Sequence, residues 1–352
     1  MTTEISFEAS SSTILDLPGN PIPPGLELSS VPTADGLVLR VAAWRPAAKP
    51  ARGTILLLQG RAEFIEKYLE TAGDLLERGF GVVTFDWRGQ GLSGRSLADG
   101  RKGHVVRFDD FRHDLDAIAA AILPQMPGPV VGLAHSMGGC VALTAAAEGW
   151  LPVEKLVAAA PMVGLSVVKQ ERAVRATVRL LSLAGMASRF VPGGEARSIS
   201  TLPFEGNRLC SDPRRYARNA AIATALEAGA IGAPTIGWLD AAYRAMDRLQ
   251  SPGFAARITI PTLVVAAGDD PVCSTPAIEL FARKLPLGSF VVIPGARHEI
   301  LMESDPIRRR FWEVFDEFVA GRDRPPLPIE TVQHRPVQAR VAAGHDGAPF
   351  GS

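Results

Sequence analysis

A serine lies where an apolar run of the sequence changes abruptly into a run of small residues. Residues 130–143 read VVGLAHSMGGCVAL, which places Ser136 between a strand-like stretch and a helix-prone, Ala-rich stretch. A sharp strand-to-helix turn of the pattern G-x-S-x-G holds a serine hydroxyl above a sheet, and small neighbours permit that turn. Here Ala134 occupies the place of the first glycine, and Gly138 and Gly139 follow the serine. Taken alone, the pattern fits a nucleophile or an ordinary turn.

A serine nucleophile needs a base that removes its proton and an acid that orients the base. The chain has six histidines, at positions 104, 113, 135, 298, 334 and 345. His298 directly follows the last apolar run, at the sheet edge where a ligand crevice opens, so we expect it to be the base. His135 is adjacent to the serine and is expected to shape the turn. His113 lies among aspartates on a predicted helix and is expected to face solvent.

Two acids end the last but one of the apolar runs, at residues 261–270. The segment LVVAAGDDPV places Asp269 and Asp270 directly after a glycine. Adjacent acids in such a position also form turns, and their spacing leaves both open as the catalytic acid. The order of Ser136, an aspartate and then His298 is the chain order found in α/β-hydrolases.

An acyl-transfer site also needs two fixed N–H donors for the oxyanion of the tetrahedral intermediate. We expect one donor to be the amide of Met137, at the start of the helix that follows Ser136. The other is expected in the loop LLLQGRAEF after an earlier apolar run, where Gly60 lets the backbone approach closely. The amide of Arg61 would be the donor there.

Short apolar runs recur along the chain and predict the elements that position these residues. They are residues 54–60, 81–89, 129–136, 155–161, 261–270 and 289–298. Val, Ile and Leu dominate them, as in strands buried on both faces of a parallel sheet. Helical patterns lie between them, and an Asp-Gly pair at 35–36 predicts a hairpin before the first run. The alternation predicts an α/β fold with a mostly parallel, doubly wound sheet.

The sequence divides into a core, an insertion and two ends. Residues 26–163 and 257–320 are predicted to form the core. Residues 164–256 carry no convincing strand, and we expect them to form a helical cap inserted before the acid-bearing strand. We expect residues 1–25 to be a poorly ordered lead-in and residues 321–352 to be a disordered tail.

Composition excludes several classes of function. The 352 residues include 37 Lys and Arg against 37 Asp and Glu, which gives no sign of a nucleic-acid partner. The sequence shows neither a secretory signal nor an apolar run long enough to span a bilayer. The three cysteines, Cys140, Cys210 and Cys273, fit neither a disulfide framework nor a zinc site. We therefore expect a cytoplasmic protein without a metal or other cofactor.

In its ordered motifs the chain resembles the monoacylglycerol lipase and bacterial lysophospholipase branch of the α/β-hydrolases. The resemblance covers residues 25–320 and rests on LLLQGRAEFIEKYLE, FDWRGQGLSGR, AHSMGG, NRLCSDPRRY, GAPTIGWLDAA, AGDDPV and GARHEILME. It implies that Ser136 is the nucleophile, Asp270 the acid and His298 the base. It favours Asp270 over Asp269 because the family's acid precedes an x-Val pair.

The resemblance also implies that the amides of Arg61 and Met137 form the oxyanion hole. Two positions depart from the family pattern. Ala134 replaces the usual glycine, from which we expect slight strain at the turn. Gln59 replaces the histidine common in monoacylglycerol lipases, which favours the lysophospholipase side.

The sequence thus predicts a serine hydrolase that cleaves carboxylic esters of lysophospholipids or monoacylglycerols through an acyl-enzyme on Ser136. The alternatives are an aminopeptidase-type or acyltransferase α/β-hydrolase, and a non-catalytic ligand-binding relative. In the cap, Arg172, Arg175 and Arg179 share one helical stripe. This stripe either faces water or brings the protein to the anionic inner face of the membrane.

Overall fold

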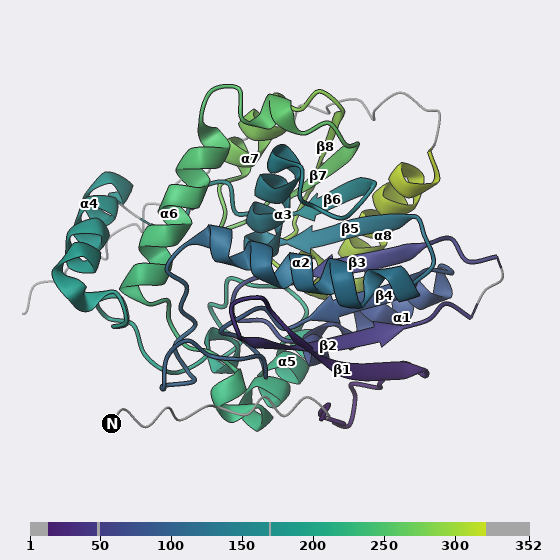
Figure 1. Ribbon diagram of the computed structural model, residues 1–352, viewed down its shortest axis with the longest axis horizontal. Helices are drawn as coiled ribbons and strands as arrows, with labels where there is room; N and C mark the ends of the chain where they lie inside the picture. The colour runs from purple at the N-terminus through teal and green to yellow at the C-terminus, as the bar shows by residue number, and fades with distance from the viewer. Residues whose placement is uncertain (1–12, 48–49, 169, 322–352) are drawn as a thin grey trace, which may run out of the picture.

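A central sheet of eight strands dominates the structure, a computed structural model that describes residues 13–47, 50–168 and 170–321 (Figure 1). The strands are β1 (Leu26–Pro32), β2 (Val38–Trp44), β3 (Thr54–Leu58), β4 (Gly81–Phe85), β5 (Val130–His135), β6 (Lys155–Ala159), β7 (Thr262–Ala267) and β8 (Gly288–Ile293). Their order across the sheet is β1-β2-β4-β3-β5-β6-β7-β8. The strands from β3 to β8 run parallel, while β2 is antiparallel to both β1 and β4.

Helices cover both faces of the sheet. One face packs on α1 (Leu69–Glu77) and α8 (Asp305–Ala320), and the other on α2 (Phe111–Ala121), α3 (Ser136–Glu148) and α7 (Thr275–Ala282). Each face has its own cluster of buried apolar side chains. Because both faces are covered, the central strands are apolar throughout, as β3 and β7 show. The predicted doubly wound α/β fold, its hairpin and its six parallel strands are confirmed.

The long interval between β6 and β7 contains the remaining helices. They are α4 (Glu171–Leu181), α5 (Pro213–Ala225) and α6 (Ile236–Gln250), and no strand is assigned to the described residues of this interval. Shorter helical turns join them: η4 (Ser182–Met186), η5 (Ile199–Thr201), η6 (Glu227–Gly229) and η7 (Ala255–Arg257). Helix α6 packs on α3 and α4 (Figure 1). None of the helices in the described part of the chain has the length and apolar character needed to cross a bilayer.

Short helical turns also occur in the core, at η1 (Ile65–Tyr68), η2 (Phe108–Asp110), η3 (Leu123–Gln125) and η8 (Ile300–Met302). Residues 13–25 differ from the poorly ordered lead-in that the sequence suggested. Asn20 is buried, and its side-chain nitrogen donates to the carbonyl oxygen of Glu66 at 2.9 Å. Leu15 and Leu17 pack against the buried apolar cluster that includes Phe64. The tail expected over 321–352 lies outside the described residues from 322 onward.

Candidate active site

Ser136 stands on a strained turn between the central strand β5 and helix α3. Its φ is 50°, a left-handed value that costs energy for a residue with a side chain. The two glycines after it allow α3 to pass close to neighbouring segments. A Cβ on Gly138 would lie 2.4 Å from the carbonyl oxygen of Gln59, and one on Gly139 would lie 2.8 Å from Pro161. Ala134 is buried within β5 and has no positive φ, so the strained backbone is at the serine itself.

The structure brings Ser136, His298 and Asp270 into one chain of hydrogen bonds. His298 Nε2 lies 2.9 Å from Ser136 Oγ, and His298 Nδ1 lies 2.9 Å from Asp270 Oδ2. These residues follow β5, β8 and β7, whose carboxyl ends share one edge of the sheet. Residues far apart in the sequence therefore meet because parallel strands present their ends together.

The surroundings of Asp270 keep its carboxylate ionised and determine the tautomer of His298. Burial alone would raise the pKa of Asp270, but His298 and the amides of Cys273 and Val272 hold it below its usual value. Asp270 Oδ1 accepts hydrogen bonds from these amides at 2.9 and 2.8 Å. An ionised carboxylate can only accept, so His298 Nδ1 carries the proton and Nε2 is free to accept from the Ser136 hydroxyl.

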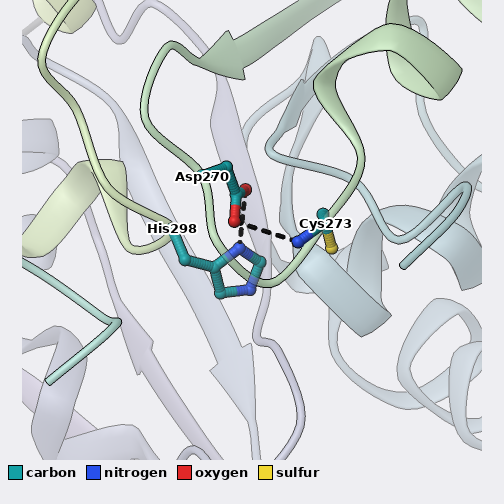
Figure 2. A group of neighbouring side chains, drawn as sticks. All are labelled: Asp270, Cys273 and His298. Carbon is teal, nitrogen blue, oxygen red and sulfur yellow. Dashed lines mark hydrogen bonds and ion pairs between the residues drawn. The ribbon is translucent and has the colours of Figure 1, made fainter. Parts of the chain in front are cut away.

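Asp270, Cys273 and His298 form a cluster of potential metal ligands (Figure 2). Their ligand atoms lie within 4.8 Å of one another, and these residue types bind zinc elsewhere. Here the Asp270 oxygens already accept from His298 and from two backbone amides. Burial also raises the pKa of the Cys273 thiol well above its usual value, which opposes the thiolate that a metal would need. The arrangement is better explained as a hydrogen-bonded acid–base pair.

The turn that follows β3 lies against the start of α3. A Cβ on Gly60 would lie 2.8 Å from Glu63 Oε2 and 3.0 Å from the Cδ2 of His135, so a larger residue here would force one of these side chains to shift. Gly60 N donates to Glu63 Oε2, and Ala62 N donates to the side chain of Gln90 at 2.5 Å. Between these two held amides, the amide of Arg61 has no hydrogen-bond partner among the described residues. It is therefore available to a ligand, as an oxyanion donor must be.

A buried ionic cluster beside His298 was not found by sequence reasoning. Lys67 lies between Glu63 and Glu299, with both Nζ–carboxylate distances at 2.6 Å, and all three side chains are buried. The Tyr68 hydroxyl donates to Glu63 at 2.6 Å. Because Glu299 follows His298 and Glu63 accepts from Gly60 N, the cluster connects the turn after β3 to the loop that carries His298. The signal in the sequence was a Glu–Lys pair at i and i+4, which also suits an exposed helix.

His135 occupies the space between this cluster and His298. Its Nδ1 lies 3.1 Å from the carbonyl oxygen of Ala159, and its ring centroid is 4.9 Å from that of His298. Burial lowers the pKa of His135 to about 4, although Glu63 opposes this shift. His135 is thus neutral at pH 7, and it packs beneath the turn as expected from the sequence.

The other candidate residues from the sequence are not members of the hydrogen-bond chain of Ser136, His298 and Asp270. His104 contacts Thr235 at 2.8 Å, and His113 is half-buried on α2. The three cysteines are buried and unpaired. In the insertion, Arg175 pairs with Glu171 and Asp247, and Arg179 pairs with Asp240, whereas Arg172 is exposed. His334 and His345 lie outside the described residues.

Comparison with known proteins supplies a family. Residues 49–305 match the family described as "Serine aminopeptidase, S33". Lysophospholipase L2 of Escherichia coli strain K12 is 34% identical over 269 residues, which are 72% of this chain and 76% of the relative. The probable lysophospholipase L2 of Haemophilus influenzae is 28% identical over 274 residues, which are 76% of this chain and 84% of the relative.

A solved structure matches the fold over nearly its whole length. It is a soluble variant of monoglyceride lipase from Saccharomyces cerevisiae in complex with a substrate analog. The match has a TM-score of 0.66 at 20% sequence identity, and it covers 85% of this chain and 98% of that chain. At this identity the likeness concerns the arrangement of strands and helices.

Proposed function

This chain belongs to the serine aminopeptidase S33 family of α/β-hydrolases, and from this premise we propose that Ser136, His298 and Asp270 are its catalytic triad. The protein is a carboxylic ester hydrolase that acts on lipid-like substrates. The observation that carries the proposed triad is the continuous hydrogen-bond chain from Ser136 Oγ through His298 to Asp270.

The proposed reaction proceeds through an acyl-enzyme. His298 Nε2 takes the proton from Ser136 Oγ as this oxygen attacks the ester carbonyl carbon. The amides of Arg61 and Met137 stabilise the oxyanion that forms. As the carbon–oxygen bond of the leaving group breaks, His298 gives its proton to the leaving alcohol. A water molecule then attacks the acyl-enzyme with His298 as base, which releases the fatty acid and restores Ser136.

We propose a lysophospholipid as the substrate and a monoacylglycerol as the second candidate. The relatives named lysophospholipase L2 support the first, and the structural relative named monoglyceride lipase supports the second. Gln59, whose buried side chain donates to Thr84 at 3.1 Å, also favours the first. This position departs from the histidine pattern of the monoacylglycerol lipases.

An aminopeptidase reaction is the rival within the same family. Such an enzyme would hold the free amine of its substrate with an unpaired carboxylate. Outside the triad, the carboxylates that act on His298 are Glu299 and Glu63, and both are already paired with Lys67. This pairing favours an ester substrate. Acyl transfer to a second alcohol would use the same acyl-enzyme.

We also propose that α4 and the turn after it contact a membrane, but through other residues than the arginine stripe that the sequence suggested. Arg175 and Arg179 are paired within the insertion and are poor candidates for anionic lipid. Leu180 and Leu183 instead remain 68% exposed each, and Arg172 lies exposed on the same helix. Exposed leucines beside a cation suit the surface of a bilayer. We propose a cytoplasmic protein that meets the inner face of the membrane with this segment.

The triad is tested by Ser136→Ala. We expect ester hydrolysis to fall by about 10⁴- to 10⁶-fold, because the nucleophile is lost while the fold is kept. The assay compares a lysophospholipid, a monoacylglycerol, a short aryl ester and an aminoacyl amide at equal protein concentration. Labelling by a fluorophosphonate should disappear in the same variant.

Ser188→Ala, at an exposed serine of the insertion, is the matched control and should keep full activity and labelling. Circular dichroism of both variants checks that the fold is unchanged. Substantial residual activity in Ser136→Ala would refute the proposed nucleophile. Faster cleavage of the aminoacyl amide than of any ester would favour the aminopeptidase.

A further inference from the structure

The side chain of Arg61 leaves the turn after β3 and reaches the insertion. Its Nη2 donates to the carbonyl oxygen of Gly232 at 2.8 Å, and its Cζ lies 4.9 Å from the ring centroid of Trp238 on α6. Its Nε is buried and has no acceptor among the described residues. Its Nη1 also has no acceptor there, and this atom is not buried. A guanidinium carries about five N–H donors, so most of those of Arg61 are unused.

Three other arginines of the described chain, each buried or half-buried, have more partners than Arg61. Arg40 and Arg88 each bind two carboxylates. Arg95 has no carboxylate partner, but it donates to the carbonyl oxygens of five residues. Arg61 has no carboxylate partner and donates to only one carbonyl oxygen among the described residues, and burial lowers its pKa to about 9. It is still a cation at pH 7, held in a place where an added anion would be stabilising.

The length of the Arg61 side chain, measured from its amide, matches one class of substrate. This step rests on the proposed function, in which the Arg61 amide binds the oxyanion. The path of covalent bonds from the Arg61 amide nitrogen to Cζ is as long as the path from the ester carbonyl carbon to phosphorus in a 1-acyl lysophospholipid. A substrate whose carbonyl oxygen meets the amide can therefore place its phosphate beside the guanidinium.

We propose that the Arg61 guanidinium binds the phosphate of a lysophospholipid head group and selects phosphate-bearing monoacyl lipids over neutral monoacylglycerols. The unused N–H donors form charge-assisted hydrogen bonds with the phosphate oxygens. Trp238 and the Gly232 carbonyl oxygen hold the guanidinium in place, so it is ordered before the substrate arrives. One residue thus contributes its backbone to catalysis and its side chain to head-group recognition.

The test compares two soluble esters that differ in the head group. They are 1-hexanoyl lysophosphatidylcholine and 1-hexanoylglycerol, both used as monomers so that binding to a surface plays no part. The measured quantity is the ratio of kcat/KM for the first ester to kcat/KM for the second. A substitution that disturbs the oxyanion amide of Arg61 lowers kcat/KM for both esters alike, so this ratio does not change.

We expect the ratio to fall about 10- to 100-fold in Arg61→Gln, since hydrogen bonds to a charged group are lost. Arg61→Lys should recover part of the ratio, because it keeps the charge without the planar fork. Arg208→Gln is the matched control, since it removes an exposed arginine from the insertion that has no part in the proposed sites. Its ratio should equal that of the wild type.

Calorimetric binding of glycerophosphocholine gives a second readout that needs no catalysis. The wild type should bind it, and Arg61→Gln should bind it about tenfold more weakly or worse. Glycerol should not bind detectably. Inorganic phosphate distinguishes a site for the free ion from a site for a lipid head group. If the wild type binds inorganic phosphate as tightly as glycerophosphocholine, a head-group site is contradicted.

The outcomes separate this inference from the proposed function. An unchanged ratio in Arg61→Gln, together with unchanged binding of glycerophosphocholine, would overturn the role of Arg61 and leave the hydrolase intact. Absence of lysophosphatidylcholine hydrolysis by the wild type would instead overturn the proposed substrate. In that case, binding of glycerophosphocholine that depends on Arg61 would still support the phosphate site, and its absence would refute it.

Discussion

Asp269 and Asp270 are adjacent in the sequence and lie in different surroundings. The side chain of Asp270 is buried against His298, whereas Asp269 is exposed. Asp270→Asn should lower kcat by about 10⁴-fold, because an amide favours the wrong tautomer of His298 and cannot support its positive charge. Asp269→Asn is the matched control and should have little effect on ester hydrolysis. Greater sensitivity at Asp269 would show that the acid has been assigned to the wrong residue.

As the proposed base, His298 should determine the acidic limb of the pH profile through its pKa. Burial alone would lower this pKa, and the neutral His135 adds no charge, but Asp270, with smaller contributions from Glu299 and Glu63, raises it above 6.5. The base must be neutral to accept a proton. The kcat/KM should therefore fall as the pH drops through this raised pKa.

Two measurements check this limb. A profile of kcat/KM on a short aryl ester from about pH 5 to about pH 9 should place it above the ordinary histidine value. A histidine NMR titration of Asp270→Asn should show a lower pKa for His298, because the carboxylate that favours the cation is gone. An unchanged pKa in this variant would contradict the assigned cause.

At the scale of elements, helix α4 and the turn after it combine a paired polar side with an exposed apolar side. Val178 packs inward, while Leu180 and Leu183 are both 68% exposed. Replacing both leucines by Gln should weaken binding to anionic vesicles about tenfold or more, because two apolar side chains no longer enter the lipid surface. Vesicle sedimentation measures this binding.

Leu280→Gln on α7 is the control for that experiment, because Leu280 is a 59% exposed leucine on a different helix. It should sediment like the wild type. The double variant Arg175→Gln, Arg179→Gln should also bind normally, since both arginines are paired with acids on helix α6. Equal sedimentation of all variants would remove α4 from the membrane proposal.

At the scale of the whole molecule, an ionic cluster joins the insertion to the core. Arg215 on α5 pairs with Glu70 on α1 and with Asp305 at the start of α8, at 2.5 and 2.7 Å. Arg308 on α8 also pairs with Glu70, at 2.8 Å. The Glu70 carboxylate on α1 therefore binds arginines from α5 and α8, two helices that are distant from it in the sequence.

Arg215→Ala should lower the free energy of unfolding by about 2 kcal/mol, because the buried Asp212 and the partly exposed Glu70 each lose a charge-assisted hydrogen bond from this guanidinium. Arg214→Ala, at a neighbouring arginine whose side chain is 76% exposed, should change it by less than about 0.5 kcal/mol. Denaturant unfolding measures both.

Burial alone would raise the pKa of Glu70, but its arginine partners lower it to about 2. The stability that this carboxylate supplies is therefore complete above its ordinary pKa and is lost as the pH falls towards 2. The difference between the wild type and Arg215→Ala should shrink over that range. A difference independent of pH would contradict an ionic origin.

The sequence determined the fold class and the residues now proposed as the triad, because these depend on local patterns. Apolar runs alternating with helical patterns define a parallel sheet, and such a sheet brings the ends of its strands to one edge. Ser136 could be recognised because the turn needs small residues after it, and the clash that a Cβ on Gly138 would cause shows why. The choice of Asp270 over Asp269 rested on family resemblance, since both fit the local pattern.

Only the tertiary structure decided which charged residues are buried and which are paired. Glu63 and Lys67 look like an exposed helical pair in sequence, yet they lie buried beside Glu299, which is far away along the chain. The Arg175 partner Asp247 likewise comes from a separate helix. A charged side chain becomes buried or paired through contacts between distant segments, so the local periodicity of the sequence does not predict its burial or its partner. For the same reason, the unused donors of Arg61 become visible only when its neighbours in the insertion are in place.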